Sequence, residues 1–392
     1  VLSNTDQRFS PAITDGPYGS NLKPGQVIKL QSTYDSTTRD MFIGWLGAIQ
    51  PSSGLSPDVT TITAQGWMSR AMSAPVAIPV AENTTCDAVV DTVLDTSGIY
   101  PPGTSLWSLG TAGLSELGQT TRLGSTASFF VAETGKSTFT FAGDDFTENT
   151  TVWGAIQNLC GREYGRLYVD RAGTINFINR HHLVSDLSTD FTFTNNFSEL
   201  DYSFGDPDDM ANAVSVKART RRETSGAVVA GLQDPVAIPG SGSVDITYVL
   251  TTQDAGSAVA VKSPTPPVQT TDFLVNSSED GTGTNLTSSV TASIPAATSF
   301  ATRVTVTYTN ASASAGYVLA GAQLRGTKLD NWAVVEAKQT DTDSVAAYGR
   351  REFAWPYAMD NLDTAESIAE FILLERAEPR NRVRHIAFKP NS

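Results

Sequence analysis

A long block of strand-like patterning interrupts this sequence and constrains the fold more than any other feature. Residues 245–330 are rich in Thr, Ser and Val, have almost no helical period, and contain strand-like runs at 246–251, 304–308 and 317–324. Short strands of this kind predict a small β-sandwich. Residues 223–245, rich in Gly, Pro and Ala, look like a linker into the block. Because the two flanks share another style, we expect the block to interrupt a discontinuous domain.

The first 75 residues also have the pattern of strands. Turn signals at 15–18 and 23–26 precede strand-like runs at 27–30, 41–49 and 59–64. Consecutive strands with short polar connections are typical of a small barrel or sandwich.

Helical periodicity is confined to a few segments. A helix is predicted at 85–97, where Thr84 or Thr85 can cap the start and Gly98 can end it. A second helix is predicted at 150–163, and it leads into a predicted hairpin. The region between these two helices is rich in Gly, Ser and Thr and predicts a loop-rich insertion.

The clearest helical pattern lies at 363–377. Asp363 and Glu366 have the spacing of a capping box, and Pro379 follows the last turn. The apolar stripe of this helix includes Ile372. We expect the stripe to pack against barrel strands, because no nearby helix offers a matching apolar face.

The chain of 392 residues is acidic, with 41 Asp and Glu against 27 Lys and Arg and a formal net charge of −14. Such a surface grips a phosphate backbone poorly, but it can surround nucleic acid and let it pass. Basic residues gather in two segments, namely Arg219, Arg221 and Arg222, and then Arg376, Arg380, Arg382 and Arg384. This asymmetry suits docking between subunits, and an ordinary solvated face explains it equally well.

The two cysteines and the hydropathy say little about compartment. Cys86 and Cys160 both lie in predicted helices among apolar residues, which favours reduced core thiols and leaves a disulfide open. No run of 18 apolar residues occurs, so no membrane partner is predicted.

A search for catalytic and metal-binding motifs finds only weak candidates. His181 and His182 are adjacent and point to opposite faces of an extended chain, while His385 is distant in sequence. Residues 206–209 (Asp-Pro-Asp-Asp) lack the Gly and the distal Glu of a calcium loop, and 341–344 is no stronger. No nucleophile elbow, Walker loop or zinc-protease motif is present. We therefore predict no catalytic, cofactor-binding or metal-binding residue, no cofactor, and no enzymatic activity.

Motifs along both flanks carry a family resemblance. They are, in order, 2–11 (LSNTDQRFSP), 16–18 (GPY), 21–25 (NLKPG), 41–44 (MFIG), the hairpin motif at 163–180, and 343–352 before the last helix. In this order and spacing they resemble the minor tail proteins of long-tailed bacteriophages. The resemblance covers roughly 1–75, 150–222 and 331–390.

The resemblance implies a tail-tip baseplate hub built from two related β-barrels with inserts. Such a hub forms a ring, usually of three subunits, that closes the tail tube and anchors the central fibre or tip proteins. It implies no cofactor. Its partners would be further copies of the chain, the distal tail protein, the tape measure and the central fibre, while genomic DNA passes without specific binding. Its location would be the virion tail tip, after assembly in the host cytoplasm.

The expected fold is therefore mainly β with a few helices, a β-rich α+β fold. The expected units are a first β-barrel at 1–75, a mixed α/β insert at 76–190, a second, discontinuous β-barrel at 191–235 plus 331–392, and an inserted β-sandwich at 236–330. The family has further strands before this point, so the first barrel is expected to lack its N-terminal part.

Two alternatives to a hub remain open from the sequence. A carbohydrate-binding or adhesin-like receptor-binding module would show a cluster of exposed Trp and Tyr. A glycan-degrading enzyme would hold two carboxylates about 5–10 Å apart in a cleft.

Overall fold

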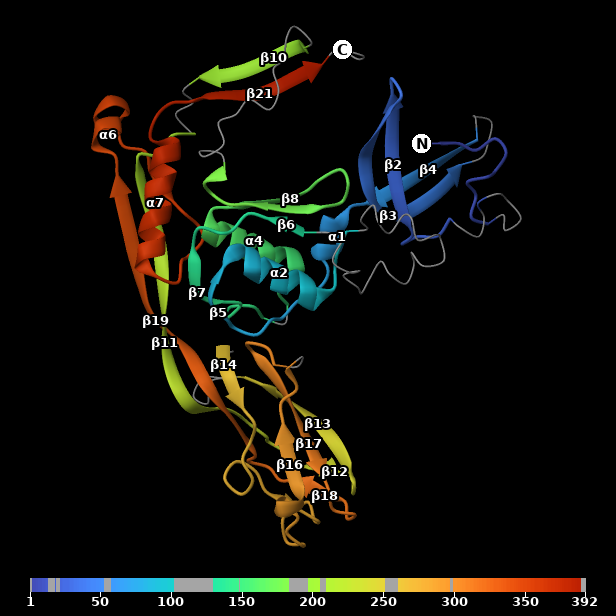
Figure 1. The fold of residues 1–392 in the computed structure, drawn as a ribbon, viewed down its shortest axis with the longest axis vertical. Helices are drawn as coiled ribbons and strands as arrows, with labels where there is room; N and C mark the ends of the chain where they lie inside the picture. The colour runs from blue at the N-terminus through green and yellow to red at the C-terminus, as the bar shows by residue number, and fades with distance from the viewer. Residues whose placement is uncertain are drawn as a thin grey trace.

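The computed structural model describes residues 2–12, 18, 22–52, 58–101, 130–147, 149–182, 197–204, 209–250, 260–296 and 299–388. These residues form a mainly β fold with a few helices, as the patterning predicts (Figure 1). The N-terminal sheet, an α/β unit, a long two-stranded ribbon and a distal β unit follow one another in space (Figure 1).

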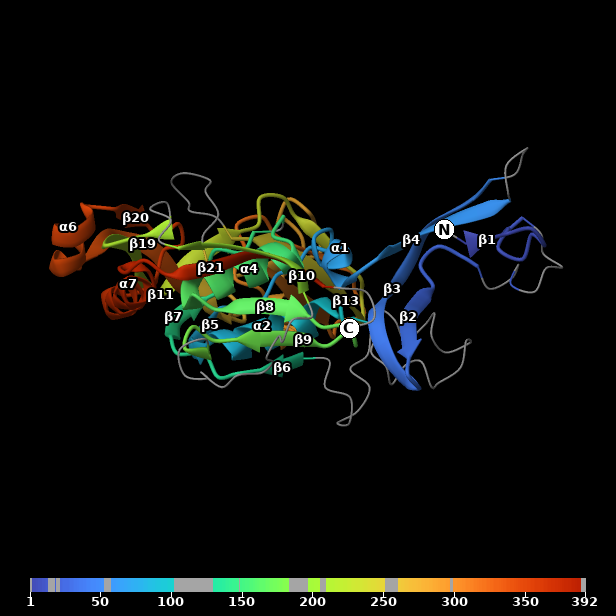
Figure 2. The same ribbon diagram turned by 90° about the horizontal axis from the view of Figure 1, so that it is seen from above.

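The N-terminal sheet is antiparallel, with strand order β1-β4-β3-β2. Its strands are β1 (Leu2–Ser3), β2 (Val27–Tyr34), β3 (Thr37–Ser52) and β4 (Val59–Gln65). Gly44 on β3 is needed because a Cβ there would lie 2.3 Å from the carbonyl oxygen of Gln65. The sheet stands to one side of the other units (Figure 2). Closure of this sheet into a barrel stays a prediction.

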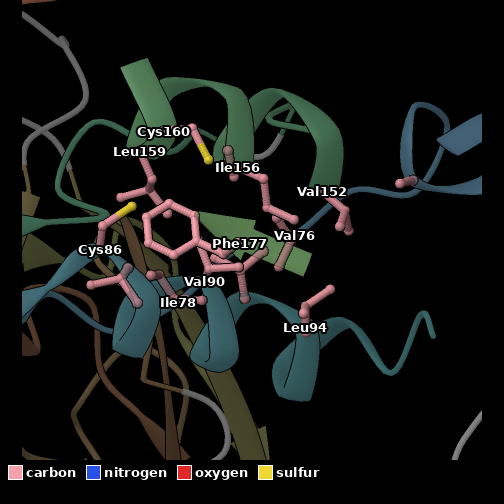
Figure 3. Close-up of a cluster of buried hydrophobic side chains, with 14 of the residues drawn as sticks. Val76, Ile78, Cys86, Val90, Leu94, Val152, Ile156, Leu159, Cys160 and Phe177 are labelled. Atoms are coloured by element: carbon pink, nitrogen blue, oxygen red, sulfur yellow. The ribbon is translucent and has the colours of Figure 1, made fainter. Parts of the chain in front are cut away.

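The α/β unit packs three helices around one apolar core. Its elements are α1 (Trp67–Ala71), β5 (Ala81–Thr85), α2 (Cys86–Ser97), β6 (Phe130–Ala132), β7 (Thr138–Ala142), α4 (Val152–Glu163), β8 (Arg166–Val169) and β9 (Ile175–Ile178). Leu94 of α2, Ile156 of α4 and Phe177 of β9 converge in this core (Figure 3).

Helices α2 and α4 begin and end close to the predicted positions. Thr85 is the N-cap of α2, and Gly98 ends it with a left-handed φ of 65°, which a side chain adopts only with strain. Thr151 caps α4, because its hydroxyl accepts a hydrogen bond from the backbone N–H of Gly154 at 3.1 Å.

The ribbon is formed by β11 (Ala213–Gly231) and β19 (Gln323–Thr340), which pair antiparallel from end to end. The predicted linker at 223–245 is therefore wrong. Its first part continues β11, and its later part contains β12 (Val236–Ile238) and the start of β13 (Gly242–Val249). Glycine-rich sequence is tolerated here because the ladder contains bulges, one of which holds Gly226 at a φ of 66°.

The distal unit consists of two small sheets that share one apolar core. The sheet orders are β12-β18-β15 and β13-β17-β16. The remaining elements are β14 (Ala260–Thr265), β15 (Val275–Asn276), η3 (Thr287–Ser289), β16 (Val290–Ser293), β17 (Arg303–Asn310) and β18 (Gly316–Val318). The hydroxyls of Tyr248 and Tyr308 bond to one another at 2.8 Å, so both polar groups are satisfied inside the core.

The chain closes on the ribbon with α6 (Thr342–Tyr348), β20 (Glu352–Ala354) and α7 (Leu362–Arg376). Ile368 and Ile372 of α7 are fully buried in one cluster with Val216 and Ala337 of the ribbon. The expected stripe is thus packed on β11 and β19. A separate two-stranded sheet joins β10 (Phe197–Phe204) to β21 (Asn381–Phe388).

The predicted capping box of α7 is wrong. Asn361 is the N-cap, and its side-chain oxygen accepts a hydrogen bond from the N–H of Thr364 at 2.8 Å. Asn361 has the extended backbone that a cap requires, so the helix begins at Leu362 and Asp363 falls inside the first turn. There the carboxylate of Asp363 lies near the positive end of the helix dipole and faces solvent.

Candidate assembly surfaces

The ribbon has two faces because neighbouring residues in a strand point to opposite sides. One face carries Val214, Val216 and Ala218 of β11 and is covered by α7. On the other face Lys217 lies opposite Glu336, and Arg219 lies opposite Val334. All four of these residues are exposed, so this face is uncovered within the described part of the chain.

Large apolar side chains lie on the uncovered side. Trp332 is 64% exposed and Val334 is 65% exposed. Trp332, Val334 and Arg219 line one shallow hollow, and the Arg222 guanidinium lies 4.7 Å from the centre of the Trp332 ring. We call the exposed side chains of Lys217, Arg219, Trp332, Val334 and Lys338 the open sheet face. Apolar surface gathered in this way is typical of an interaction site.

The charge of the open sheet face is net positive. Lys217 and Arg219 make no ion pair with any residue that the structure describes. Lys338 pairs with Glu336 at 3.1 Å, and its side chain is still 70% exposed. The nearby pair of Arg350 and Glu352 contributes no net charge.

The outer edge of β19 is also free over part of its length. β14 pairs with β19 only from Arg325 to Leu329, and the structure shows no described strand beside residues 330–340 on that edge. The matching edge of β11 is covered, because Ser215, Lys217 and Arg219 bond to the segment 355–359. An uncovered strand edge offers backbone groups to a partner.

The exposed side of α7 has the opposite charge. Asp363, Glu366 and Glu370 recur at helical spacing on this side and make no ion pair within the described residues. Leu362 is 36% exposed and Leu374 is 67% exposed, and they flank the three acids. We call these five side chains the acidic helix face.

An aromatic pocket of about 590 Å³ lies where α4, β8, the segment after β20 and α7 meet. Its aromatic lining consists of Trp153, Tyr164, Tyr168, Trp355 and Tyr357. Arg166 and Arg376 also line it, and the Nε of Arg376 is buried without a partner among the described residues. Such a pocket has the size and the apolar character of a ligand site.

The phenol of Tyr164 is held in a partly buried position beside this pocket. Its hydroxyl donates a hydrogen bond to Glu375 at 2.6 Å. Burial, together with this carboxylate, raises the pKa of Tyr164 to about 12. Tyr164 therefore stays neutral and works as a hydrogen-bond donor that fixes the end of α7.

A second, charged cavity joins the α/β unit to the ribbon. Arg221 pairs with Asp144 at 2.5 Å, and Arg162 lies 3.6 Å from Asp360. Burial raises the pKa of Asp144. The backbone N–H of Phe141 also donates to Asp360 at 3.2 Å. Since each of these charged groups bonds to the neighbouring unit, we interpret the cavity as a structural junction.

The histidines identified in the sequence do not converge. The Nδ1 of His182 lies 2.5 Å from Glu133, while the His181 ring stacks on Phe371 with centroids 5.4 Å apart. His385 lies on β21, 3.9 Å from Glu199. Burial lowers the pKa of His181. Among the residues that the structure describes, no group of three His, Cys, Asp or Glu side chains could hold a metal ion.

The structure describes one of the two acidic motifs in full and only one residue of the other. Asp341 is the N-cap of α6 and accepts a hydrogen bond from the N–H of Ser344 at 2.9 Å, which accounts for the motif at 341–344. Of the motif at 206–209, only Asp209 lies within the described residues. Cys86 and Cys160 are free and buried, with their sulfurs in the same core (Figure 3).

The two arginine segments lie in different parts of the chain. Arg219 and Arg222 belong to the exposed ribbon. Arg380 follows α7 and donates a hydrogen bond to the carbonyl of Leu374 at 2.8 Å, and the Arg376 guanidinium lies over the Phe353 ring. Arg382 and Arg384 lie on β21.

Sequence reasoning missed the aromatic pocket and the acidic helix face. The pocket joins residues of four distant segments, so no local pattern reveals it. The acids at 363, 366 and 370 do have helical spacing, so the sequence contained a signal for the acidic helix face.

Among the described residues, no helix has both the length and the apolar character to span a bilayer.

Comparison with known proteins gives partial likenesses. No protein-family profile and no curated protein matches the sequence. The chain is similar to the tail protein from Neisseria meningitidis MC58, with a TM-score of 0.30 and 11% identity over 48% of this chain and 51% of that one. It is also similar to the 43 kDa tail protein of prophage MuSo2 from Shewanella oneidensis, with a TM-score of 0.32 and 10% identity over 52% of each chain. The matched region spans about half the length of each of these proteins.

Proposed function

We propose that this chain is a structural subunit of the tail of a long-tailed bacteriophage and acts at the tail tip as a baseplate hub. The observation that carries the proposal is the open sheet face, where Trp332 and Val334 remain about two-thirds exposed on a central, extended ribbon. Apolar side chains held on a rigid ribbon suit a protein that completes its surface by assembly. The motifs that resemble minor tail proteins support a phage tail as the assembly.

The assembly that we propose is a closed ring of three subunits. It closes the tail tube, and the two barrels of each chain would give the ring its collar. The formal net charge of −14 suits a lumen lined by carboxylates, because DNA that leaves the tail must not adhere to the wall. Genomic DNA would pass through this lumen without specific binding.

The proposed partners are other tail proteins, namely the distal tail protein, the tape measure and the central fibre. The proposed location is the virion tail tip, reached after assembly in the host cytoplasm. The role needs no cofactor and no catalysis. The N-terminal sheet stands apart from the α/β unit, so it offers a second surface for such partners (Figure 2).

Electron microscopy of the purified chain tests the ring. Class averages should show a closed ring, and mass photometry should give three times the 41.7 kDa of one chain. Gold-labelled antibody against the chain should mark one end of the tail in the virion that contains it. A chain that stays monomeric at every concentration, or labelling along the whole tail tube, would contradict the proposal.

A second function, recognition of a saccharide, is favoured by the aromatic pocket. Trp and Tyr rings that line a pocket offer the flat apolar surfaces that sugar rings stack on. The described lining contains two arginines and no carboxylate, so a sugar bound here would need to be acidic. Calorimetric titration with neutral and acidic oligosaccharides tests this function. Saccharide binding that is lost in the Trp355→Ala variant would support this function. If neither the neutral nor the acidic oligosaccharides give a heat of binding, this function is excluded.

A further inference from the structure

We propose that the open sheet face of one subunit docks on the acidic helix face of the next copy of this chain. This inference rests on the proposed function, since it names the contact from which the ring is built. The two faces lie on opposite sides of one two-layer unit, because α7 covers the side of the ribbon that the open sheet face does not use (Figure 2). A contact between two different faces is heterologous, and heterologous contacts generate rings when the rotation closes.

Charge is the first argument for this pairing. The open sheet face carries the cations Lys217 and Arg219, of which Lys217 lies opposite Glu336 and helps to lower its pKa. The acidic helix face carries Asp363, Glu366 and Glu370 without ion-pair partners in the described chain. Each face therefore repels a copy of itself and attracts the other face. A two-fold contact between identical faces is disfavoured for the same reason.

Apolar surface is the second argument. Trp332 and Val334 lie beside the cations of the open sheet face, and Leu362 and Leu374 flank the acids of the helix. Interfaces commonly surround an aromatic or aliphatic anchor with polar groups, and such anchors supply most of the binding energy. Each face thus carries both the charged groups and the apolar anchors that an interface of this kind needs.

The identity of the occupant follows from the same residues. An unrelated partner would have to match the two faces separately, whereas the chain itself carries both complementary surfaces. Both faces also belong to one rigid packing unit, since Ile372 of α7 is fully buried against the ribbon. Their relative orientation is therefore fixed before assembly, which lowers the entropic cost of forming the contact.

Charge reversal in the full-length chain tests the contact. We expect Lys217→Glu with Arg219→Glu to weaken assembly at least about tenfold, because acidic surfaces would then face each other. Glu366→Lys with Glu370→Lys should weaken it to a similar extent. The chain that carries all four substitutions restores opposite charges and should recover the ring. Mass photometry against concentration measures the three chains and the wild type.

A matched control excludes a simple effect of net charge. Asp234→Lys with Glu279→Lys changes the charge by the same amount as the helix-face pair, at two exposed positions of the distal unit. This control should assemble like the wild type. Far-ultraviolet circular dichroism spectra should be unchanged in every variant, since all the substituted side chains are exposed. Raising the salt concentration should weaken the wild-type ring.

The outcomes separate this inference from the proposed function. If the wild type forms a ring that both reversed pairs leave intact, this contact is wrong and the ring proposal stands. If the four-substitution chain stays monomeric while it is folded, the two faces do not meet. If the wild type never assembles, the proposed ring fails and this inference fails with it.

Discussion

Asp280 shows how a single exposed carboxylate is held by its local chain. Its Oδ1 accepts hydrogen bonds from the Ser278 hydroxyl at 2.6 Å, from the Thr282 hydroxyl at 2.7 Å and from the Thr282 N–H at 3.0 Å. These donors lower the pKa of Asp280 to about 2, from an ordinary value of 3.8. A lowered carboxylate pKa stabilises the fold above the ordinary value, and this contribution is lost as the pH falls through about 2.

We predict that Thr282→Val raises the pKa of Asp280 toward its ordinary range, because two of the three donors involve Thr282 and its hydroxyl is removed. Carbon-detected NMR of the carboxyl signal between about pH 1.5 and 5 measures it. Thr309→Val, at an exposed strand position, is the control and should leave the Asp280 titration unchanged. An unaltered midpoint in Thr282→Val would show that the hydroxyl is not a donor.

The two thiols are the second residue-scale case. Cys86 is fully buried, and burial raises its pKa well above the ordinary thiol value, with Cys160 as its neighbour. The thiolate is the reactive form, so accessibility and ionisation both oppose reaction at Cys86, while burial opposes it at Cys160. We predict that neither cysteine reacts with Ellman's reagent in the native protein at pH 8 and that both react after denaturation. Rapid native reaction, or fewer than two thiols after denaturation, would contradict this.

At the scale of elements, α7 anchors the ribbon. We predict that Ile372→Asp lowers the free energy of unfolding by at least about 3 kcal/mol, because it leaves a charge unpaired in a closed apolar core. Val249→Asp on β13 is the control, since Val249 is 62% exposed, and it should cost no more than about 1 kcal/mol. Urea unfolding followed by circular dichroism gives both values. Equal midpoints for the two variants would place Ile372 at the surface.

The elements differ in how much of them the sequence reveals. The boundaries of α2 and α4 were predictable because an apolar stripe marks each helix, Gly98 ends α2 and the Thr151 side chain caps α4. The cap of α7 was not, since Asn361 and Asp363 are both good capping residues and the difference between them is set by the backbone of the preceding turn. Local competition of this kind is resolved by tertiary structure.

The ribbon was harder to predict for a different reason. The second half of β11, 223–231, is exposed from Glu223 to Gly226 and rich in small residues, so it has the composition of a linker. It is a strand because β19 supplies partners almost 100 residues later in the sequence. The candidate surfaces follow the same rule: the acids of α7 have a visible spacing, whereas the open sheet face depends on which side of the ribbon α7 covers.

At the scale of the whole molecule, the distal unit hangs from the ribbon and has a core of its own. Within the described residues, its core draws on β11 from Ala227 onward and on β19 only up to Leu324. Its contacts with the α/β unit include the pair of Lys262 with Glu82 at 2.7 Å, the hydrogen bond from the Ala301 N–H to the Ile78 carbonyl at 3.0 Å, and a small cluster around Phe141 and Leu329. The proposed assembly faces lie on the opposite part of the ribbon and on α7, so the distal unit is not needed for them.

We therefore predict that residues 225–327 can be replaced by Asn-Gly without loss of folding or assembly. Thr224 and Lys328 are directly paired, so a two-residue turn closes the shortened ribbon into a hairpin. The loss of the contacts with the α/β unit should lower the melting temperature by only about 2–8 °C. Circular dichroism and mass photometry measure the two effects. As a control, Lys217→Glu with Arg219→Glu in the shortened chain should weaken assembly as expected in the full chain. If the shortened chain aggregates, the distal core supports the ribbon. If the shortened chain is a folded monomer, the ring is held by the distal unit and not by the two proposed faces.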